Sequence, residues 1–243
     1  MSRIYHNIIS VIKNNKKLLA VLIDPDKMEL EKVFSFIEKG NQSIATHIFV
    51  GASEVEISDT ERVILEIKKH TNLPIVLFPG DVTQITDKAD GILFLSLISG
   101  RNSEYLIGKH VEAVSKLYKT ELEIIPTGYV LVESGKQTAV ERVSETKPLS
   151  HNNIEAIVDT AKAGEILGMR LIYLEAGSGA SHPVNTKIIS EVKKRLNIPL
   201  IVGGGIRSKQ QLQNAYNSGV DMVVIDTAFE ENEDFFEELK KQL

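Results

Sequence analysis

The stretch IYLEAGSGA, residues 172–180, begins as a buried strand and ends as a glycine-rich turn. Its first three residues suit the interior of a parallel sheet, whereas Glu175 and the glycines on either side of Ser178 do not. A carboxylate and a bare backbone at the carboxyl end of a strand have no role in core packing. They indicate that the strands of this chain carry its chemistry at their carboxyl ends.

Seven other apolar runs of similar length occur along the 243 residues, each separated from the next by an amphipathic segment. Most are nearly continuous in Val, Ile and Leu, as expected when helices cover the outer face of a parallel sheet. The repeated strand and helix predict a single (β/α)8 TIM-like barrel over residues 1–243, with an open doubly wound sheet as the alternative. The predicted strands are residues 19–23, 47–50, 75–78, 91–95, 122–125, 171–174, 200–202 and 222–225.

One unit departs from this pattern, because the short segment between Pro79 and Asp90 leaves little room for a covering helix. We expect a short or irregular third helix and a gap in the outer ring. The amphipathic residues 4–12 are expected to plug or flank the bottom of the barrel. Three helix starts resemble capping boxes: Asp26 with Glu29, Ser58 with Glu61, and Ser208 with Gln211.

Net charge, cysteine content and the length of the apolar runs exclude several classes of protein. The net charge is −5 and no basic block occurs, so nucleic acid is not an expected partner. The absence of cysteine excludes disulfides and thiolate chemistry. The longest apolar run, residues 18–23, is too short to cross a bilayer, and no signal peptide is visible. We expect a cytoplasmic protein, with transient contact with a membrane surface left open.

Glycines also follow the seventh strand, at Gly204 and Gly205, and a hydroxyl follows the eighth, at Thr227. Glycine lets backbone amides approach an oxyanion closely, and the loops after strands seven and eight are the usual phosphate site of such barrels. These strand ends, with Ser178 and Thr227 as hydroxyl donors, predict a phosphate site. A dinucleotide loop is not predicted, because the third glycine of that fingerprint is missing after Gly179.

Oxygen donors end the first two strands. The carboxylate of Asp24 could bind Mg²⁺ or transfer a proton, with an Asp-Pro turn as the structural alternative. Asp26 is expected to cap the following helix instead. The Ser53 hydroxyl could complete a magnesium shell. Glu175 and Asp24 would then face a phosphorylated polyol and a magnesium-bound second substrate.

The chain resembles geranylgeranylglyceryl phosphate synthases and their bacterial relatives, in segments spread over its whole length. The stretch from Tyr173 to Gly179 is the most specific match, whereas the glycine triplet at 203–205 is weak alone. Further matching segments are residues 22–27, 104–109, 127–129 and 202–207.

The resemblance implies a Mg²⁺-dependent prenyltransferase that joins sn-glycerol 1-phosphate to a prenyl diphosphate, geranylgeranyl diphosphate in the first place, and releases diphosphate. It also implies a homo-oligomer, and an irregular third helix beside which a long apolar tail passes. Glu175 and Asp24 would be catalytic, and Asp24 and Ser53 would hold the metal. The implied glycerol phosphate site is Tyr173, Leu174, Glu175, Ala176, Gly177, Ser178, Gly179, Gly204, Gly205, Asp226 and Thr227.

Two positions depart from the family pattern: Asp226 stands where many relatives have asparagine, and Ser134 where glycine is frequent. We expect Asp226 to cap backbone amides or to face away from the phosphate. Two other functions stay open. A sugar-phosphate isomerase or cyclase would need a second acid near residues 127–129, and a non-catalytic phosphate-metabolite binding module would leave Glu175 and Asp24 without a role.

Overall fold

Eight parallel strands close into one barrel in chain order, from β1 to β8 and back to β1, in the computed structural model, which describes residues 3–52, 59–226 and 234–240. The pairing of β8 with β1, with Val21 opposite Ile225, closes the ring. The barrel prediction is therefore confirmed and the open doubly wound sheet is wrong. The strands are β1 Leu18–Ile23, β2 His47–Val50, β3 Ile75–Leu77, β4 Gly91–Leu97, β5 Glu123–Leu131, β6 Leu171–Glu175, β7 Leu200–Gly203 and β8 Met222–Ile225.

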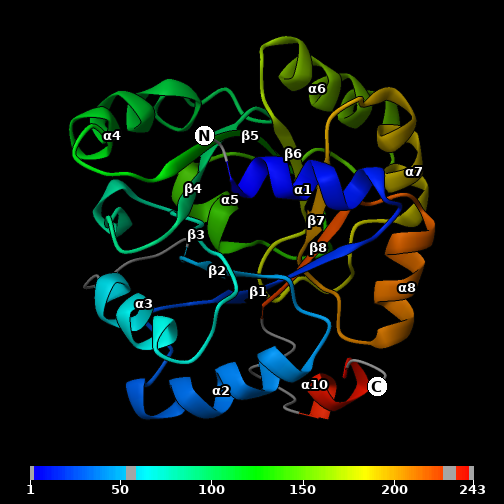
Figure 1. Ribbon diagram of the computed structural model, residues 1–243. Helices are drawn as coiled ribbons and strands as arrows, with labels where there is room; N and C mark the ends of the chain where they lie inside the picture. The colour runs from blue at the N-terminus through cyan, green and yellow to red at the C-terminus, as the bar shows by residue number, and fades with distance from the viewer. Residues whose placement is uncertain (1–2, 53–58, 227–233, 241–243) are drawn as a thin grey trace.

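Helices surround the barrel (Figure 1). No helix within the described ranges is both long and apolar enough to span a membrane. The helical elements are α1 Ile4–Lys13, α2 Leu30–Gln42, α3 Thr60–Lys68, the 3-10 turn η1 Val82–Gln84, the π-helical turn η2 Glu104–Gly108, α4 Lys109–Leu117, α5 Ala139–Ser144, α6 Ile154–Ile166, α7 Thr186–Arg195, α8 Lys209–Asn217 and α10 Asp234–Glu238.

Two of the predicted helix starts can be compared with the structure. Ser208 caps α8 by accepting the N–H of Gln211 at 3.2 Å, and the Gln211 side chain accepts the N–H of Arg207 at 2.7 Å. The prediction that Asp26 caps α2 is wrong, because the helix begins only after Glu29. The chain first makes a turn in which the Asp26 N–H donates to the Asp24 carboxylate. Ser58 lies outside the described residues.

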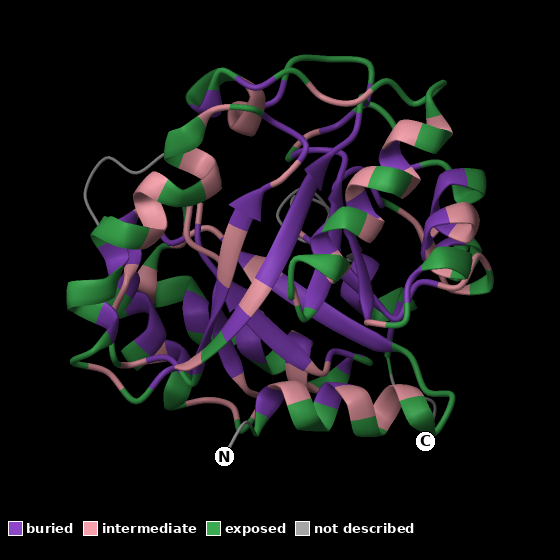
Figure 2. Ribbon diagram, turned by 90° about the horizontal axis from the view of Figure 1, so that it is seen from above, coloured by how far each residue is buried: buried purple, intermediate pink, exposed green. Residues whose placement is uncertain are grey.

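The core has two layers, one inside the barrel and one between the strands and the helices. Alternate strand residues such as Leu18, Phe49 and Tyr173 fill the inside. Their neighbours in sequence pack outward against the helices. Figure 2 shows the strands as mostly buried, whereas the surrounding helices have exposed residues on their outer faces. This packing fixes which residues at the strand ends point into the barrel mouth.

The N-terminal helix α1 closes the bottom of the barrel, as predicted. Ile4 and Ile8 are buried against the interior cluster, and α1 lies across one end of the ring in both views (Figures 1 and 2). The carboxylate of Glu123 accepts the N–H groups of Ile4 at 2.6 Å and of Tyr5 at 2.9 Å. An acid at a helix N-terminus satisfies otherwise unpaired amides and suits the helix dipole. The opposite end of the barrel is left for the site.

Between β3 and β4 the covering helix is reduced to η1, a single 3-10 turn. The prediction of a short or irregular third helix is confirmed. The carboxylate of Asp81 caps this turn by accepting the N–H of Thr83 at 3.0 Å. A three-residue turn cannot cover the sheet as a full helix does, so the outer ring is open at this point.

Strand β5 continues past residue 125, the end predicted for it, as far as Leu131. Pro126 and Gly128 interrupt the apolar run that identifies a strand in the sequence. In the structure the Pro126 carbonyl accepts the N–H of Arg170 at 2.8 Å. A Cβ on Gly128 would lie 2.9 Å from the Ile172 side chain, so glycine permits close packing there. The extension brings Tyr129 into the barrel interior.

Candidate functional site

Glu175 is a buried carboxylate at the mouth of the barrel. It ends β6, opposite Leu131 of β5 and Gly203 of β7, and is only 6% exposed. Its Oε1 accepts the Gly177 N–H at 2.5 Å, and its Oε2 accepts the Tyr129 hydroxyl at 3.1 Å. These donors fix the orientation of the carboxylate and replace part of its lost hydration.

Burial raises the pKa of Glu175 to about 7. This value includes the negative charge of Asp226, which also raises the pKa, and the hydrogen bonds from Gly177, Tyr129 and Tyr173, which lower it. Removal from water and a neighbouring like charge both disfavour the ionised form. A carboxylate with a pKa near neutrality can accept a proton from a substrate and release it again, so Glu175 has the properties of a general base.

Three aromatic rings form the wall beside Glu175. The Phe78 ring centroid lies 5.9 Å from that of Tyr129 and 5.2 Å from that of Tyr173, and the two tyrosine rings are 5.3 Å apart. Burial, and then the charge of Glu175, raise the pKa of each tyrosine well above its usual value. Both hydroxyls therefore remain protonated and act as hydrogen-bond donors.

The glycine turns after β6 and β7 touch each other. Gly177 and Gly204 have positive φ angles of 101° and 82°, which other residues rarely adopt. A Cβ on Gly204 would lie 2.5 Å from the Glu175 carboxylate and 2.7 Å from the Gly177 nitrogen. Only glycine allows this approach. The two turns therefore lie together beside Glu175, and their bare glycine backbone leaves room for the close approach of a ligand such as an anion.

The loop after β5 lies against the loop after β6. A Cβ on Gly177 would lie 2.0 Å from the Thr138 side chain, and one on Gly179 would lie 3.1 Å from the Lys136 ammonium. On the other side, Arg207 donates to the carbonyl of Ala180 at 2.8 Å. Two cations thus stand close to the β6 turn, which favours a negatively charged ligand there. The sequence pattern had identified neither Lys136 nor Thr138.

The remaining residues of the predicted glycerol phosphate site take different positions. Leu174 and Ala176 are buried in the outer core layer, so their side chains pack against that layer. Ser178 is exposed at the turn. Asp226 is partly exposed and lies near enough to Glu175 for its charge to raise the pKa of that carboxyl. Thr227 lies outside the described residues.

Asp24 follows β1 at the same end of the barrel, with its side chain 21% exposed. Its carboxylate accepts the Asp26 N–H at 3.0 Å and contacts the Lys27 ammonium at 3.1 Å, as in an Asp-Pro turn. In the described part of the chain, no three His, Cys, Asp or Glu side chains are grouped to hold a metal. Mg²⁺ commonly takes one or two carboxylates and completes its shell with substrate phosphates and water, and Asp24 fits that role. Ser53, the second predicted ligand, lies outside the described residues.

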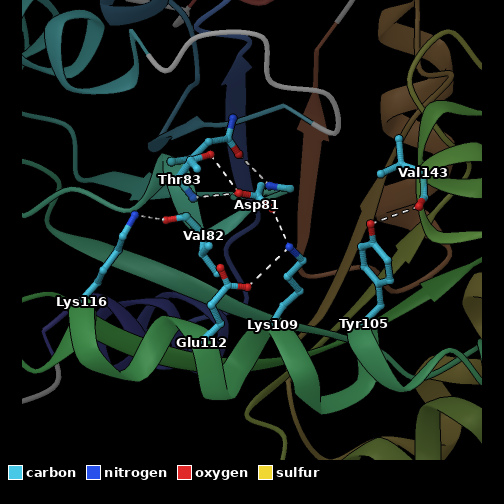
Figure 3. A network of polar contacts seen from close by, with 10 residues as sticks. Asp81, Val82, Thr83, Tyr105, Lys109, Glu112, Lys116 and Val143 are labelled. Carbon is cyan, nitrogen blue, oxygen red and sulfur yellow. Dashed lines mark hydrogen bonds and ion pairs between the residues drawn. The ribbon is translucent and has the colours of Figure 1, made fainter.

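An apolar pocket opens beside Tyr129, where η1 replaces the covering helix after β3. One wall comes from β4, another from η1, and a third from η2 and α4, whose outer polar contacts are drawn in Figure 3. Tyr129 lines the pocket and also donates to Glu175. The pocket and the carboxylate are therefore adjacent parts of one site. Side chains of the lining include Phe78, Val82, Leu93, Leu95, Leu97 and Ala113.

The sequence matches the model of the PcrB family over residues 10–243. The chain belongs to the PcrB family. Among its relatives, the geranylgeranylglyceryl phosphate synthase of Zunongwangia profunda is 59% identical, with 96% of this chain and 99% of that protein covered. The protein of the same name from Flavobacterium johnsoniae is 53% identical, with 98% of both covered.

A solved structure of similar shape is (S)-3-O-geranylgeranylglyceryl phosphate synthase from Thermoplasma acidophilum in complex with its substrate sn-glycerol-1-phosphate. It superposes with a TM-score of 0.91 at 31% identity, covering 98% of this PcrB-family chain and 96% of that one. These comparisons confirm the resemblance drawn from the sequence and the expectation that the chain is an enzyme.

Gly203 provides a test of the packing around Glu175, because a Cβ there would lie 2.0 Å from the Tyr173 hydroxyl oxygen. We expect Gly203→Ala to displace Tyr173 and to lower the free energy of unfolding by about 1–3 kcal/mol, the usual cost of overpacking a core. Urea denaturation of the two proteins measures the change. The matched control is Gly40→Ala in α2, where an added Cβ meets nothing within 4 Å. Equal stability of Gly203→Ala and wild type would show that Tyr173 is not held as described.

Proposed function

We propose that this chain joins sn-glycerol 1-phosphate to a prenyl diphosphate, forming an ether and releasing diphosphate. The observation that carries the proposal is the position of Glu175, a proton acceptor between a glycine-lined anion cradle and an apolar pocket. The relative from Thermoplasma acidophilum, whose structure contains sn-glycerol-1-phosphate, supports the acceptor. The relatives' shared name supports geranylgeranyl diphosphate as the donor.

The acceptor would bind with its phosphate against the glycine backbone of the β6 and β7 turns, beside Lys136 and Arg207. Glycerol 1-phosphate is short, so its hydroxyls would then reach the Glu175 carboxylate next to the Gly177 turn. A carboxylate that accepts a hydrogen bond from an alcohol orients that alcohol as well as accepting its proton. Such orientation of two reactants can supply about 7–11 kcal/mol of the barrier.

The donor would place its apolar tail in the pocket between η1 and α4, and its reacting carbon near Tyr129. Burial of apolar surface, at about 25 cal/mol per Å², provides the binding free energy. Tyr129 and Phe78 line the pocket, and Tyr129 also donates to Glu175. Their ring faces suit a positively charged allylic group, because aromatic faces attract cations.

In the proposed reaction, the bond between the allylic carbon and the diphosphate oxygen breaks, and that oxygen keeps the electron pair. The C3 hydroxyl oxygen of glycerol 1-phosphate forms the new bond to the same carbon. Its proton passes to Glu175, whose pKa of about 7 lets it accept the proton near neutral pH and return it to water. The protonated Tyr129 and Tyr173 keep the carboxylate in place throughout.

We further propose that Asp24 would hold Mg²⁺ when the prenyl diphosphate is bound. When bound, the ion supplies positive charge that stabilises the leaving diphosphate. The Lys27 ammonium lies 3.1 Å from the Asp24 carboxylate, so a bound Mg²⁺ would compete with it for this side chain. The predicted homo-oligomer stays a prediction.

The two rival functions fit the site less well. An isomerase or cyclase would need a second acid at the end of β5. The first acid after this strand is Glu133, which is about half exposed and contacts Ser150 and His151. A passive phosphate-binding module gives no reason for a buried proton acceptor beside an apolar pocket. Incubation with Mg²⁺, labelled glycerol 1-phosphate and a series of prenyl diphosphates tests the proposal. A labelled ether lipid is expected, and its absence with every donor would refute the proposed function.

Glu175→Gln should reduce kcat/KM by about 10²–10⁴-fold, the usual loss when a general base is removed. For wild type, kcat/KM should rise with pH through about 7, because the raised pKa leaves Glu175 protonated and unable to accept a proton below that value. Steady-state rates from acid to alkaline pH measure both effects. Glu155→Gln, an exposed acid of α6, is the control and should keep the wild-type profile. A Glu175→Gln enzyme with wild-type activity would remove Glu175 from the mechanism.

Asp24→Asn should weaken the binding of Mg²⁺ in the presence of a prenyl diphosphate by at least about tenfold, because a magnesium ligand loses its charge. Calorimetric titration with Mg²⁺ measures this directly. Binding of glycerol 1-phosphate should stay unchanged, since Asp24 is not part of the glycine cradle. Asp26→Asn changes the neighbouring acid and should behave like wild type. The same Mg²⁺ affinity in Asp24→Asn and wild type would refute the metal role.

A further inference from the structure

The outer wall of the apolar pocket is divided between two elements, η1 and α4. Val82 and Ile85 line the pocket from the η1 side, and His110 and Ala113 line it from α4. In a regular barrel a covering helix would pack along α4, but η1 is only three residues long. The wall therefore has a seam between η1 and α4.

Two lysines of α4 bridge this seam, as Figure 3 shows. The Lys109 ammonium donates to the Asp81 carboxylate at 2.9 Å, and the Lys116 ammonium donates to the Val82 carbonyl at 2.9 Å. Asp81 is itself fixed, because it also accepts the N–H and the hydroxyl of Thr83 at 3.0 and 2.9 Å. The ion pair thus joins the start of η1 to the start of α4.

The Asp81–Lys109 ion pair is accessible to water and can be broken without unfolding the protein. About one third of each side chain is exposed, 34% for Lys109 and 32% for Asp81, so water can replace either partner. Burial tends to raise the pKa of Asp81, but its hydrogen bonds with Lys109 and Thr83 outweigh this and hold the pKa below its usual value. The hydrogen bond to Asp81 raises the pKa of Lys109. Both groups are therefore charged at neutral pH.

We infer that the Asp81–Lys109 ion pair determines how long a prenyl chain the pocket accepts. The inference rests on the proposed function and deepens it. With the pair intact, η1 is held against α4 and the seam is closed, so a chain longer than the pocket has no exit. Without the pair, η1 keeps one of these two polar contacts to α4, through Lys116, and its apolar packing against Ala113, and can move outward to let the end of a longer chain pass.

The test compares kcat/KM for geranylgeranyl diphosphate with that for a longer donor, hexaprenyl diphosphate. Lys109→Met keeps the alkyl stem and removes the charge, and Asp81→Asn removes the opposite charge. Each should raise the ratio of long-donor to geranylgeranyl kcat/KM about fivefold, as expected for a partly exposed ion pair. The KM for glycerol 1-phosphate should not change, which separates this effect from general damage to the fold. The double variant Asp81→Lys/Lys109→Asp should restore the wild-type ratio.

Lys119→Met, which removes a lysine just beyond the end of α4, is the matched control and should keep the wild-type ratio. An unchanged ratio in both Lys109→Met and Asp81→Asn would overturn the inference. If the wild-type protein makes no ether, the proposed function is refuted. The role of the ion pair in chain-length selection is then tested by calorimetric binding of the two donors. The same fivefold change in relative Kd would support its role, and equal relative Kd values in wild type and both variants would overturn it.

Discussion

The contact between the β6 and β7 turns is the constraint on which the rest of the site depends. Gly204 approaches the Glu175 carboxylate and the Gly177 nitrogen so closely that no side chain fits between them. This contact buries the carboxylate, and burial raises its pKa to about 7. A buried charge is costly unless it is hydrogen-bonded, and the Gly177 amide and the Tyr129 hydroxyl meet that need. Backbone geometry and proton affinity are thus set by the same contact.

The reduction of the covering helix after β3 to η1 has a different consequence. It removes packing from the outer side of the barrel and leaves space there for the pocket. A full helix over β3 and β4 would cover the apolar side chains that now line the pocket. In its place, η1 is held by polar contacts from Asp81 and Val82 to two lysines of α4. Polar contacts between partly exposed groups are weaker and more easily exchanged with water than core packing. The site therefore combines a rigid half, around Glu175, with an adjustable half around the pocket.

Much of this could be predicted from the sequence, because the signals are local. Continuous apolar runs identified the eight strands, and the short segment after Pro79 indicated the reduced helix. The position of Tyr129 inside the barrel could not be predicted, because Pro126 and Gly128 interrupt the apolar run that would indicate the extension of β5. Asp26 was misassigned because the Asp24 turn delays the start of α2. The ion pair of Asp81 with Lys109 joins residues far apart in sequence, and only the folded chain shows it.

The most direct test of the site is the pKa of Glu175 itself. Nuclear magnetic resonance of protein carrying ¹³C-labelled glutamate side chains follows each carboxyl group through a pH titration, and the Glu175→Gln variant assigns the signal. A buried carboxylate beside Asp226 should titrate with a midpoint of about 7. A midpoint near the ordinary value of 4.5 would show that the carboxylate is hydrated, and would contradict its role as the proton acceptor.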